Sequence, residues 1–173
     1  MTSTLEARVT RCPRPHDPGR VDDIKALVGD LPPRLRELAV GAGASAPYLA
    51  GLLEKERDWL ADAVADPEAA VRAVIRGAGE LAPEGLADGL RQGKRRVALM
   101  AALADLGGAW ALEQVTGALT DYADAACAAA LHAGLVVQVK RGKLPGVTLD
   151  DLGDSGGMVV LAMGKMGAHE LNY

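Results

Sequence analysis

The sequence predicts a mainly α-helical protein that ends with the beginning of an α+β domain. Of its 173 residues, 49% are hydrophobic but only 3% are aromatic, and none is Phe. Ala, Leu and Val must therefore fill the core, which favours closely packed helices. Apolar residues recur at three- and four-residue spacing along much of the chain, as in amphipathic helices. Near residue 157 this pattern gives way to a short apolar run between glycines, which predicts the one strand.

Residues 1–20 are expected to form a loose tail. Three prolines and a glycine lie among charged residues between Pro13 and Gly19, and such a composition cannot sustain a helix. The helical region is predicted to follow, over residues 21–138.

Two helices of this region are predicted from a capping residue followed by proline. Ser45 can cap a helix whose first turn contains Pro47, and apolar residues then recur to about Val64. Asp66 repeats this signal before Pro67 and opens a shorter helix. Proline is tolerated at the first helical position because the N–H that it lacks would have no partner within the helix.

A third helix opens near Pro83 and is predicted to reach about Leu106. It carries Gly85, Gly89 and Gly93 four residues apart. Each glycine in a helix interior costs about 1 kcal/mol relative to alanine. The spacing therefore reflects either drift in an alanine- and glycine-rich chain or a smooth stripe for close helix contact.

A fourth helix, from Leu112 to about His132, has the cleanest helical period in the sequence. The longest uncharged stretch, residues 125–139, is shorter than the roughly 20 apolar residues that a spanning helix needs. Cys12 and Cys127 are too few for a disulfide framework and lack the spacing of a zinc site. With no apolar signal core at the N-terminus, these features predict a cytoplasmic protein with no membrane partner.

The charge pattern does not favour nucleic acid as a partner. The formal net charge is −4, so the protein lacks a general attraction to phosphate backbones. The basic run Lys94-Arg95-Arg96 is interpreted as a solvated helix face, with contact to an acidic or nucleotide-bearing partner as the alternative.

Residues 139–157 are predicted to form a charged loop. This stretch mixes basic residues, Pro145 and several glycines with Asp150, Asp151 and Asp154. The three carboxylates precede the predicted strand, and they are interpreted as solvated loop residues rather than as metal ligands.

Residues 158–163 form a short apolar run bounded by glycines, which is typical of a buried strand. The run leads into Gly164-Lys165-Met166-Gly167. Two glycines and an amine at a strand end suit phosphate binding, because glycine lets backbone N–H groups approach an anion and lysine adds charge. On spacing alone, a plain strand-to-helix turn explains the pattern as well. The segment does not match the P-loop motif, the dinucleotide-binding motif or the helical zinc motif. His169 is expected to be a surface or turn residue.

The segment Met163-Gly-Lys-Met-Gly167, followed by Glu170-Leu-Asn-Tyr173, resembles the first nucleotidyltransferase motif of a bacterial family. This family is the bifunctional glutamine synthetase adenylyltransferase/adenylyl-removing enzymes, and the resemblance is to their N-terminal part. Looser helical matches extend the resemblance over most of residues 45–173. One departure is Ala168, where many relatives have a second glycine.

The resemblance implies that residues 158–173 begin a polymerase-β-type nucleotidyltransferase (α+β) domain that is truncated. In this family one head attaches AMP from ATP to a tyrosine of glutamine synthetase, and the N-terminal head removes it by phosphorolysis. This chain resembles the removing head. The family's two aspartates, which hold Mg²⁺, would follow Tyr173. The chain as given is therefore expected to hold no catalytic or metal-ligating residue, to be inactive, and to bind neither Mg²⁺ nor ATP or AMP tightly.

Carried over residue by residue, the resemblance implies that Gly164, Lys165 and Gly167 line the phosphate side of the nucleotide site. Glu170 and Asn172 would orient the turn. The implied partners are glutamine synthetase and a PII-type signalling protein, with no nucleic acid and no membrane. The alternative is a non-catalytic helical protein-interaction module, favoured by the long alanine- and leucine-rich stretch and by the absence of a complete catalytic set.

Overall fold

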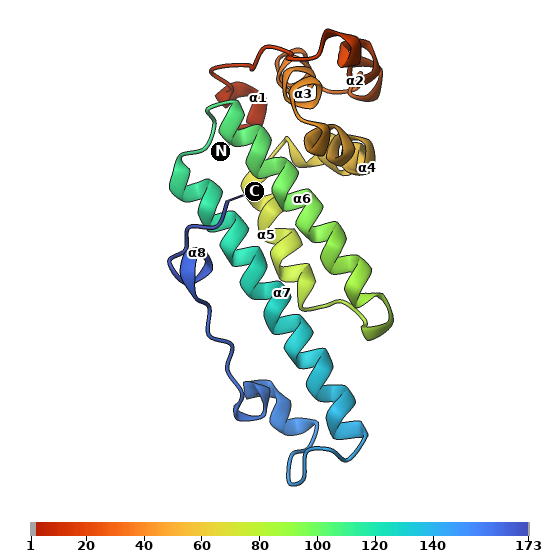
Figure 1. Ribbon diagram of the computed structural model, residues 1–173, viewed down its shortest axis with the longest axis vertical. Coiled ribbons are helices and arrows are strands. Elements are labelled where there is room, and N and C mark those ends of the chain that lie inside the picture. Colours follow the sequence, from red (N-terminus) through yellow and green to blue (C-terminus); the bar gives the residue numbers. More distant parts are fainter. Residues whose placement is uncertain (1–2, 173) are drawn as a thin grey trace.

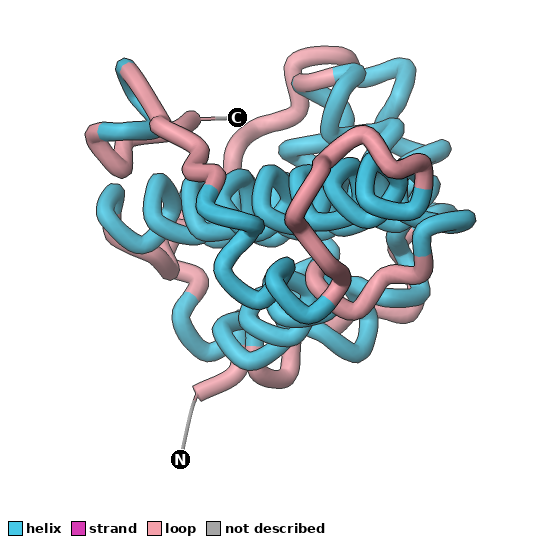
Figure 2. The backbone as a smooth tube through the Cα atoms, turned by 90° about the horizontal axis from the view of Figure 1, so that it is seen from below, coloured by secondary structure: helices cyan, strands magenta, loops and turns pink. Residues whose placement is uncertain are grey.

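The computed structural model describes residues 3–172, and throughout this range the regular segments are helices, with no strand (Figures 1 and 2). The α-helices are α1 (Leu5–Arg8), α2 (Val21–Leu27), α3 (Pro33–Ser45), α4 (Pro47–Ala63), α5 (Pro67–Ala78), α6 (Leu86–Leu106), α7 (Leu112–Lys140) and α8 (Gly164–Gly167). The 3-10 helices are η1 (Pro18–Arg20), η2 (Pro83–Gly85) and η3 (Asp150–Gly157). The prediction of a mainly α-helical fold is confirmed.

The helices form two groups that share one core. Helices α1 to α4 gather at one end of the molecule, while α5, α6 and α7 run side by side along its length (Figure 1). The C-terminal half of α6 lies where the groups meet, and residues 97–104 are all buried. A helix that is apolar on every side must be surrounded, and here α3, α4, α5 and α7 contact α6.

The helix starts illustrate what a local signal can decide. Asp66 caps α5 as predicted, since its Oδ1 accepts a hydrogen bond from the Ala69 N–H at 2.9 Å. The predicted Ser45 cap is wrong: Ser45 is the last residue of α3, and α4 starts after Ala46 without a side-chain cap. The Ser45 hydroxyl instead accepts from the His16 N–H at 3.1 Å. A neighbouring segment thus competes for the same oxygen.

Residues 3–20, which we call the N-terminal arm, do not form the loose tail expected for residues 1–20. The first four-residue helix buries Leu5 completely. The Leu5 N–H donates to the Val64 carbonyl at 2.9 Å, and the Thr10 N–H donates to the Gly107 carbonyl at 2.9 Å. The arm is thereby tied to the end of α4 and the end of α6. Prolines prevent a long helix but do not prevent docking.

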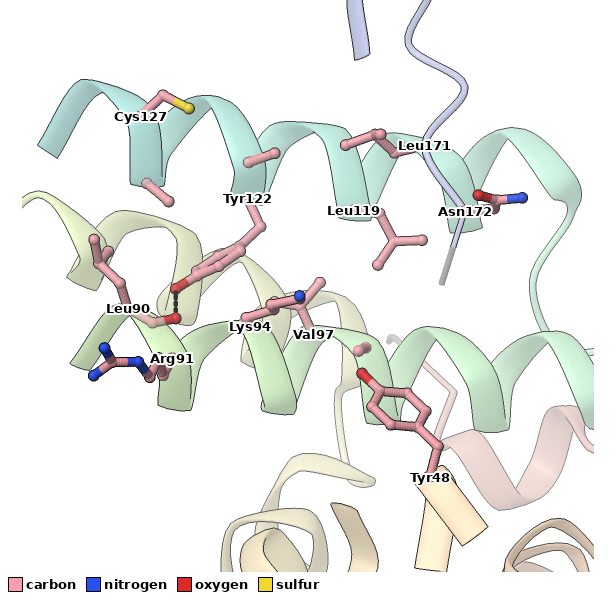
Figure 3. A pocket seen from close by; sticks show the side chains of 13 residues that line it. Tyr48, Leu90, Arg91, Lys94, Val97, Leu119, Tyr122, Cys127, Leu171 and Asn172 are labelled. Atoms are coloured by element: carbon pink, nitrogen blue, oxygen red, sulfur yellow. Dashed lines mark hydrogen bonds between the residues drawn. The ribbon is translucent and has the colours of Figure 1, made fainter. Parts of the chain in front are cut away.

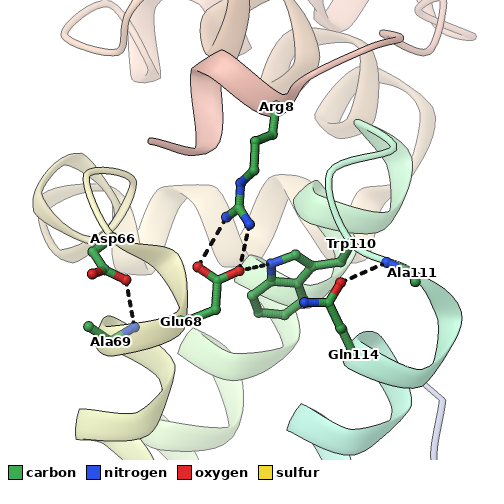
Figure 4. A network of polar contacts seen from close by, with 7 residues as sticks. All are labelled: Arg8, Asp66, Glu68, Ala69, Trp110, Ala111 and Gln114. Atoms are coloured by element: carbon green, nitrogen blue, oxygen red, sulfur yellow. Dashed lines mark hydrogen bonds and ion pairs between the residues drawn. The ribbon is translucent and has the colours of Figure 1, made fainter. Parts of the chain in front are cut away.

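An ion pair fixes the arm to the core of the longer helices (Figure 4). The Arg8 Nη1 and Nη2 groups donate to the two carboxylate oxygens of Glu68 at 2.7 and 3.1 Å. The indole N–H of Trp110 donates to Glu68 Oε1 at 2.7 Å. Burial by itself raises the pKa of Glu68, but these hydrogen bonds outweigh it and the pKa lies below its ordinary value.

The basic run Lys94-Arg95-Arg96 has a structural use that neither interpretation of the sequence anticipated. Arg95 and Arg96 donate through Nε to the two oxygens of Glu56, at 2.6 and 3.0 Å. Glu56 is only 2% exposed, so its charge needs these partners. The guanidinium of Arg96 also stacks over the Trp59 ring, 5.5 Å from its centroid. Two of the three cations therefore join α4 to α6, and Lys94 stays exposed.

Two of the three glycines predicted for this helix, Gly89 and Gly93, lie in α6 and are in close contact with neighbouring side chains. A Cβ at Gly93 would overlap the Tyr122 ring of α7, and one at Gly89 would overlap the Leu81 side chain. A Cβ added at Gly85 would have no other atom within 4 Å. The smooth-stripe interpretation therefore holds for the part of the helix that faces its neighbours.

Helix α7 runs to Lys140, well past the predicted end near His132. Its last turns extend beyond α6 and pack against η3 (Figure 1), which buries Leu135 and Leu152. By length and composition, α7 could cross a membrane, and 17% of its apolar window is buried. Core helices of other proteins meet the same criteria, so the prediction that the protein has no membrane partner stays a prediction.

The strand predicted over residues 158–163 is absent. The backbone there is extended, but no neighbouring strand exists among residues 3–172. The side chains are open to solvent, with Val159, Leu161 and Met163 being 80%, 83% and 85% exposed. A strand is defined by hydrogen bonds to a second strand, and an apolar sequence alone does not supply them. The nucleotidyltransferase domain expected to start here thus stays a prediction.

Candidate functional site

The predicted phosphate turn forms the single-turn helix α8 at the end of the extended segment. Gly164 has a φ of 60°, in the left-handed region that favours glycine, and it breaks the extended run. Gly167 lies so close to the Ala162 carbonyl that a side chain would collide with it. Both glycines are therefore required by the backbone, which is what a tight turn or a phosphate loop needs.

The structure brings Gly164, Lys165 and Gly167 together in this turn and places Glu170 beside them. The Glu170 N–H donates to the Lys165 carbonyl at 2.7 Å, which closes the turn. The Lys165 and Glu170 side chains are exposed. Asn172 lies apart from the turn, at a groove between α6 and α7. The nucleotide-binding role of these residues stays a prediction, and Tyr173 of the motif lies outside the described residues.

After the turn, the chain docks on α7. The imidazole Nε2 of His169 lies 3.1 Å from Asp121 Oδ1, and the Leu171 N–H donates to the Thr120 hydroxyl at 3.4 Å. His169 has a φ of 61°, which confirms the interpretation as an exposed turn residue. Residues 164–172 thus belong to the surface of α7, although residues 158–163 are free of the core.

An open apolar groove of about 830 Å³ lies along α6 and α7, and we call it the α6–α7 groove (Figure 3). The α6 side is lined by Leu90, Arg91, Lys94, Val97 and Ala98. The α7 side is lined by Leu119, Tyr122, Ala123, Ala126 and Cys127. Tyr48 of α4 points into one end, and Leu171 and Asn172 lie at its edge.

Polar groups in this groove are few and unevenly placed. The Tyr122 hydroxyl donates to the Leu90 carbonyl (Figure 3), and burial raises the pKa of this phenol. Arg91 pairs with Asp88 at 2.8 Å, whereas Lys94 has no ion pair within residues 3–172. Among residues 3–172, no Asp or Glu side chain lines the groove. The sequence pattern that predicted a buried face on α7 included Leu119, Tyr122 and Ala126, but it could not indicate that the face is left partly open.

No group of three or more His, Cys, Asp or Glu side chains in the described part of the chain could hold a metal ion. Asp151 instead stabilises its own loop, because its Oδ2 accepts from the N–H and the hydroxyl of Thr148, each at 2.7 Å. These bonds lower its pKa below the ordinary value. Cys12 and Cys127 are free thiols.

Comparisons with known proteins link the helical region and the glycine turn to one family. A family model described as "Glutamate-ammonia ligase adenylyltransferase" matches residues 39–173. A bifunctional glutamine synthetase adenylyltransferase/adenylyl-removing enzyme of Caulobacter vibrioides is 41% identical over 75% of this chain and 14% of its own length. Proteins of the same description from Bradyrhizobium diazoefficiens and Rhodopseudomonas palustris strain HaA2 are 37% and 31% identical, over 91% and 99% of this chain.

The chain spans 16% and 19% of the length of these last two relatives. No solved structure matches the chain. The resemblance stated from the sequence motif is confirmed by the family model and by the relatives.

Proposed function

Because this chain belongs to the glutamate-ammonia ligase adenylyltransferase family, we propose that it is the N-terminal part of an enzyme that adds AMP to, and removes it from, glutamine synthetase. The observation that carries the proposal is the match over residues 39–173, which includes both the helical region and the glycine turn. Glutamine synthetase is the proposed substrate, because the names of the relatives state it. A PII-type signalling protein and a cytoplasmic location are proposed on family resemblance.

We assign this chain to the adenylyl-removing head. Support comes from the order of its parts, in which a helical region precedes the segment similar to the first nucleotidyltransferase motif. In this assignment, Gly164, Lys165 and Gly167 contact the phosphates of ATP or AMP. The Lys165 amine is exposed and free to meet an anion.

Mg²⁺ is proposed as the metal of the parent enzyme on family resemblance. Two-metal sites for phosphoryl chemistry hold the ions between carboxylates, and the described residues contain no such cluster. The proposal therefore assigns no metal ligand here. It expects the chain alone to bind ATP and AMP weakly and to have no activity.

A chimera tests the proposal. The matching region of the Caulobacter vibrioides relative is replaced by this chain, and two activities are measured separately. One is removal of the AMP group from adenylylated glutamine synthetase by phosphate, which yields ADP, and the other is attachment of AMP from ATP. Both activities should be retained. Lys165→Ala in the chimera should slow AMP removal by about 10- to 100-fold, because a charge-assisted hydrogen bond contributes about 1.5–3 kcal/mol. It should leave AMP attachment within about twofold.

Lys143→Ala is the matched control, since Lys143 is an exposed lysine in the loop after α7. If Lys165→Ala slowed attachment instead of release, the assignment to the removing head would be wrong. If the chimera kept both activities and Lys165→Ala changed neither, the phosphate role of the turn would be wrong. That result would favour the alternative, a non-catalytic helical interaction module, for which the α6–α7 groove is the supporting observation.

A further inference from the structure

The α6–α7 groove has the shape that receives a third helix. On α6 its lining residues follow the spacing of one helix face, at positions 90, 94, 97 and 98. On α7 they do the same, at positions 119, 122, 123 and 126. Residues at three- and four-residue spacing form the ridges into which the side chains of another helix pack. The α6 positions cover about 12 Å at 1.5 Å per residue, or roughly two helical turns.

The groove is also charged on one edge only. Arg91 and Lys94 line it from α6, and no acidic side chain lines it from either helix. Lys94 is exposed and without an ion pair within residues 3–172. An occupant with a carboxylate opposite Lys94 would pair with this cation, while its apolar face covers Leu90, Leu119 and Ala123.

The C-terminal segment of the chain touches the groove. Leu171 lies at its edge (Figure 3), where its N–H donates to the Thr120 hydroxyl at 3.4 Å. Leu171 is the one apolar side chain of residues 158–172 that lines the groove, and the half-exposed Tyr48 lies at the groove's end. Exposed aromatic residues beside an apolar groove are typical anchors for a protein partner.

We propose that the α6–α7 groove is the docking site for an amphipathic helix of another polypeptide, with apolar residues at three- and four-residue spacing and Glu or Asp along the edge that faces Lys94. This surface is distinct from the glycine turn, so the inference does not depend on the proposed enzymatic function. None of Gly164, Lys165, Gly167 and Glu170 lines the groove.

Two labelled helical peptides test the proposal against the full 173-residue chain. They share an apolar face of Leu and Ala and differ only in one edge, which carries Glu in the first and Lys in the second. Fluorescence anisotropy should show at least about tenfold tighter binding of the Glu-edged peptide, a difference that corresponds to about 1.4 kcal/mol. Lys94→Glu should reverse this preference, while Lys143→Glu, the same charge change away from the groove, should leave it unchanged.

A second pair of variants separates packing from charge. Ala123→Gln places a longer neutral side chain in the groove and should weaken binding of the Glu-edged peptide about tenfold. Ala128→Gln, on an exposed position of α7 outside the groove, should not. Circular dichroism checks that each variant keeps its helices. Equal binding of both peptides, binding unaffected by Lys94→Glu and Ala123→Gln, or a dimer of the chain that fills the groove in sedimentation would each overturn the proposal.

Discussion

The N-terminal arm and the extended segment at residues 158–163 both differ from what their compositions predict. The arm is docked on the core, and the apolar segment is exposed. The arm contains three prolines and several charges, yet Leu5 is fully buried and Arg8 reaches Glu68 on α5. The later segment is uncharged and apolar, yet its large side chains are exposed. Both segments lack long helices, so secondary structure does not distinguish them.

The difference lies in the partners that each segment finds. The arm runs past the ends of α4 and α6, where free carbonyl groups of Val64 and Gly107 accept its N–H groups. Such groups lack partners at the end of any helix. The extended segment meets no second strand within residues 3–172. Docking thus depends on complementary groups nearby rather than on hydrophobicity alone.

Truncating one apolar side chain in the arm and one in the extended segment should give the largest difference in unfolding free energy. Leu5→Ala should lower the free energy of unfolding by about 2–5 kcal/mol, because it leaves a cavity under the arm. Met163→Ala, on a side chain that is 85% exposed, should change it little. Urea unfolding followed by circular dichroism measures both. Equal effects would mean that the two ends are packed alike.

A substitution at Gly41, which lies against the arm, tests whether docking of the arm stabilises the protein. Gly41→Ala adds a Cβ that collides with the Pro13 carbonyl, so it should cost about 1–3 kcal/mol and displace the arm. Gly51→Ala, in α4 with open space around it, should instead stabilise by about 0.5–1 kcal/mol.

Hydrogen exchange reports where the arm moves in this variant. The Thr10 amide should be protected in the unaltered protein and exchange faster in Gly41→Ala, because its bond to Gly107 is lost. Amides of residues 159–162 should exchange rapidly in both. Protection of residues 159–162 would show that the extended segment is packed after all.

The smallest expected effect concerns the pH dependence of the arm's ion pair. The folded pKa of Glu68 lies below its ordinary value of 4.5, so its contribution to stability is present above that value and is lost as pH falls through the folded pKa. Glu68→Gln should cost about 1 kcal/mol near neutral pH, because the pair is only part-buried.

Acid unfolding provides the check on this ion pair. The gap between the unaltered protein and Glu68→Gln should close as the pH is lowered below 4.5. A gap that stayed constant down to the acid transition would mean that the charge of Glu68 contributes nothing and that its contacts act only as neutral hydrogen bonds.

Much of the helical fold could be predicted because its signals are local. The Asp66 cap, the proline starts and the glycine after Leu106 lie within a few residues of the ends that they mark. The missed helix α3 begins with Pro33, but its N-cap residue is Pro32, which supplies no side-chain cap. At the candidate site, the glycine turn was predictable for the same reason, whereas the α6–α7 groove was not, because it is formed by helices about thirty residues apart in sequence.

Local sequence was sufficient for the helical class, for the starts of α4 to α7, and for the motif that identifies the family. Tertiary structure decided whether the arm docks, which carbonyl group Ser45 and Thr10 bind, and whether residues 158–163 become a strand. A helix satisfies its backbone hydrogen bonds within itself. An arm or a strand must satisfy them with residues far away in the chain, and those partners are not encoded in its own segment.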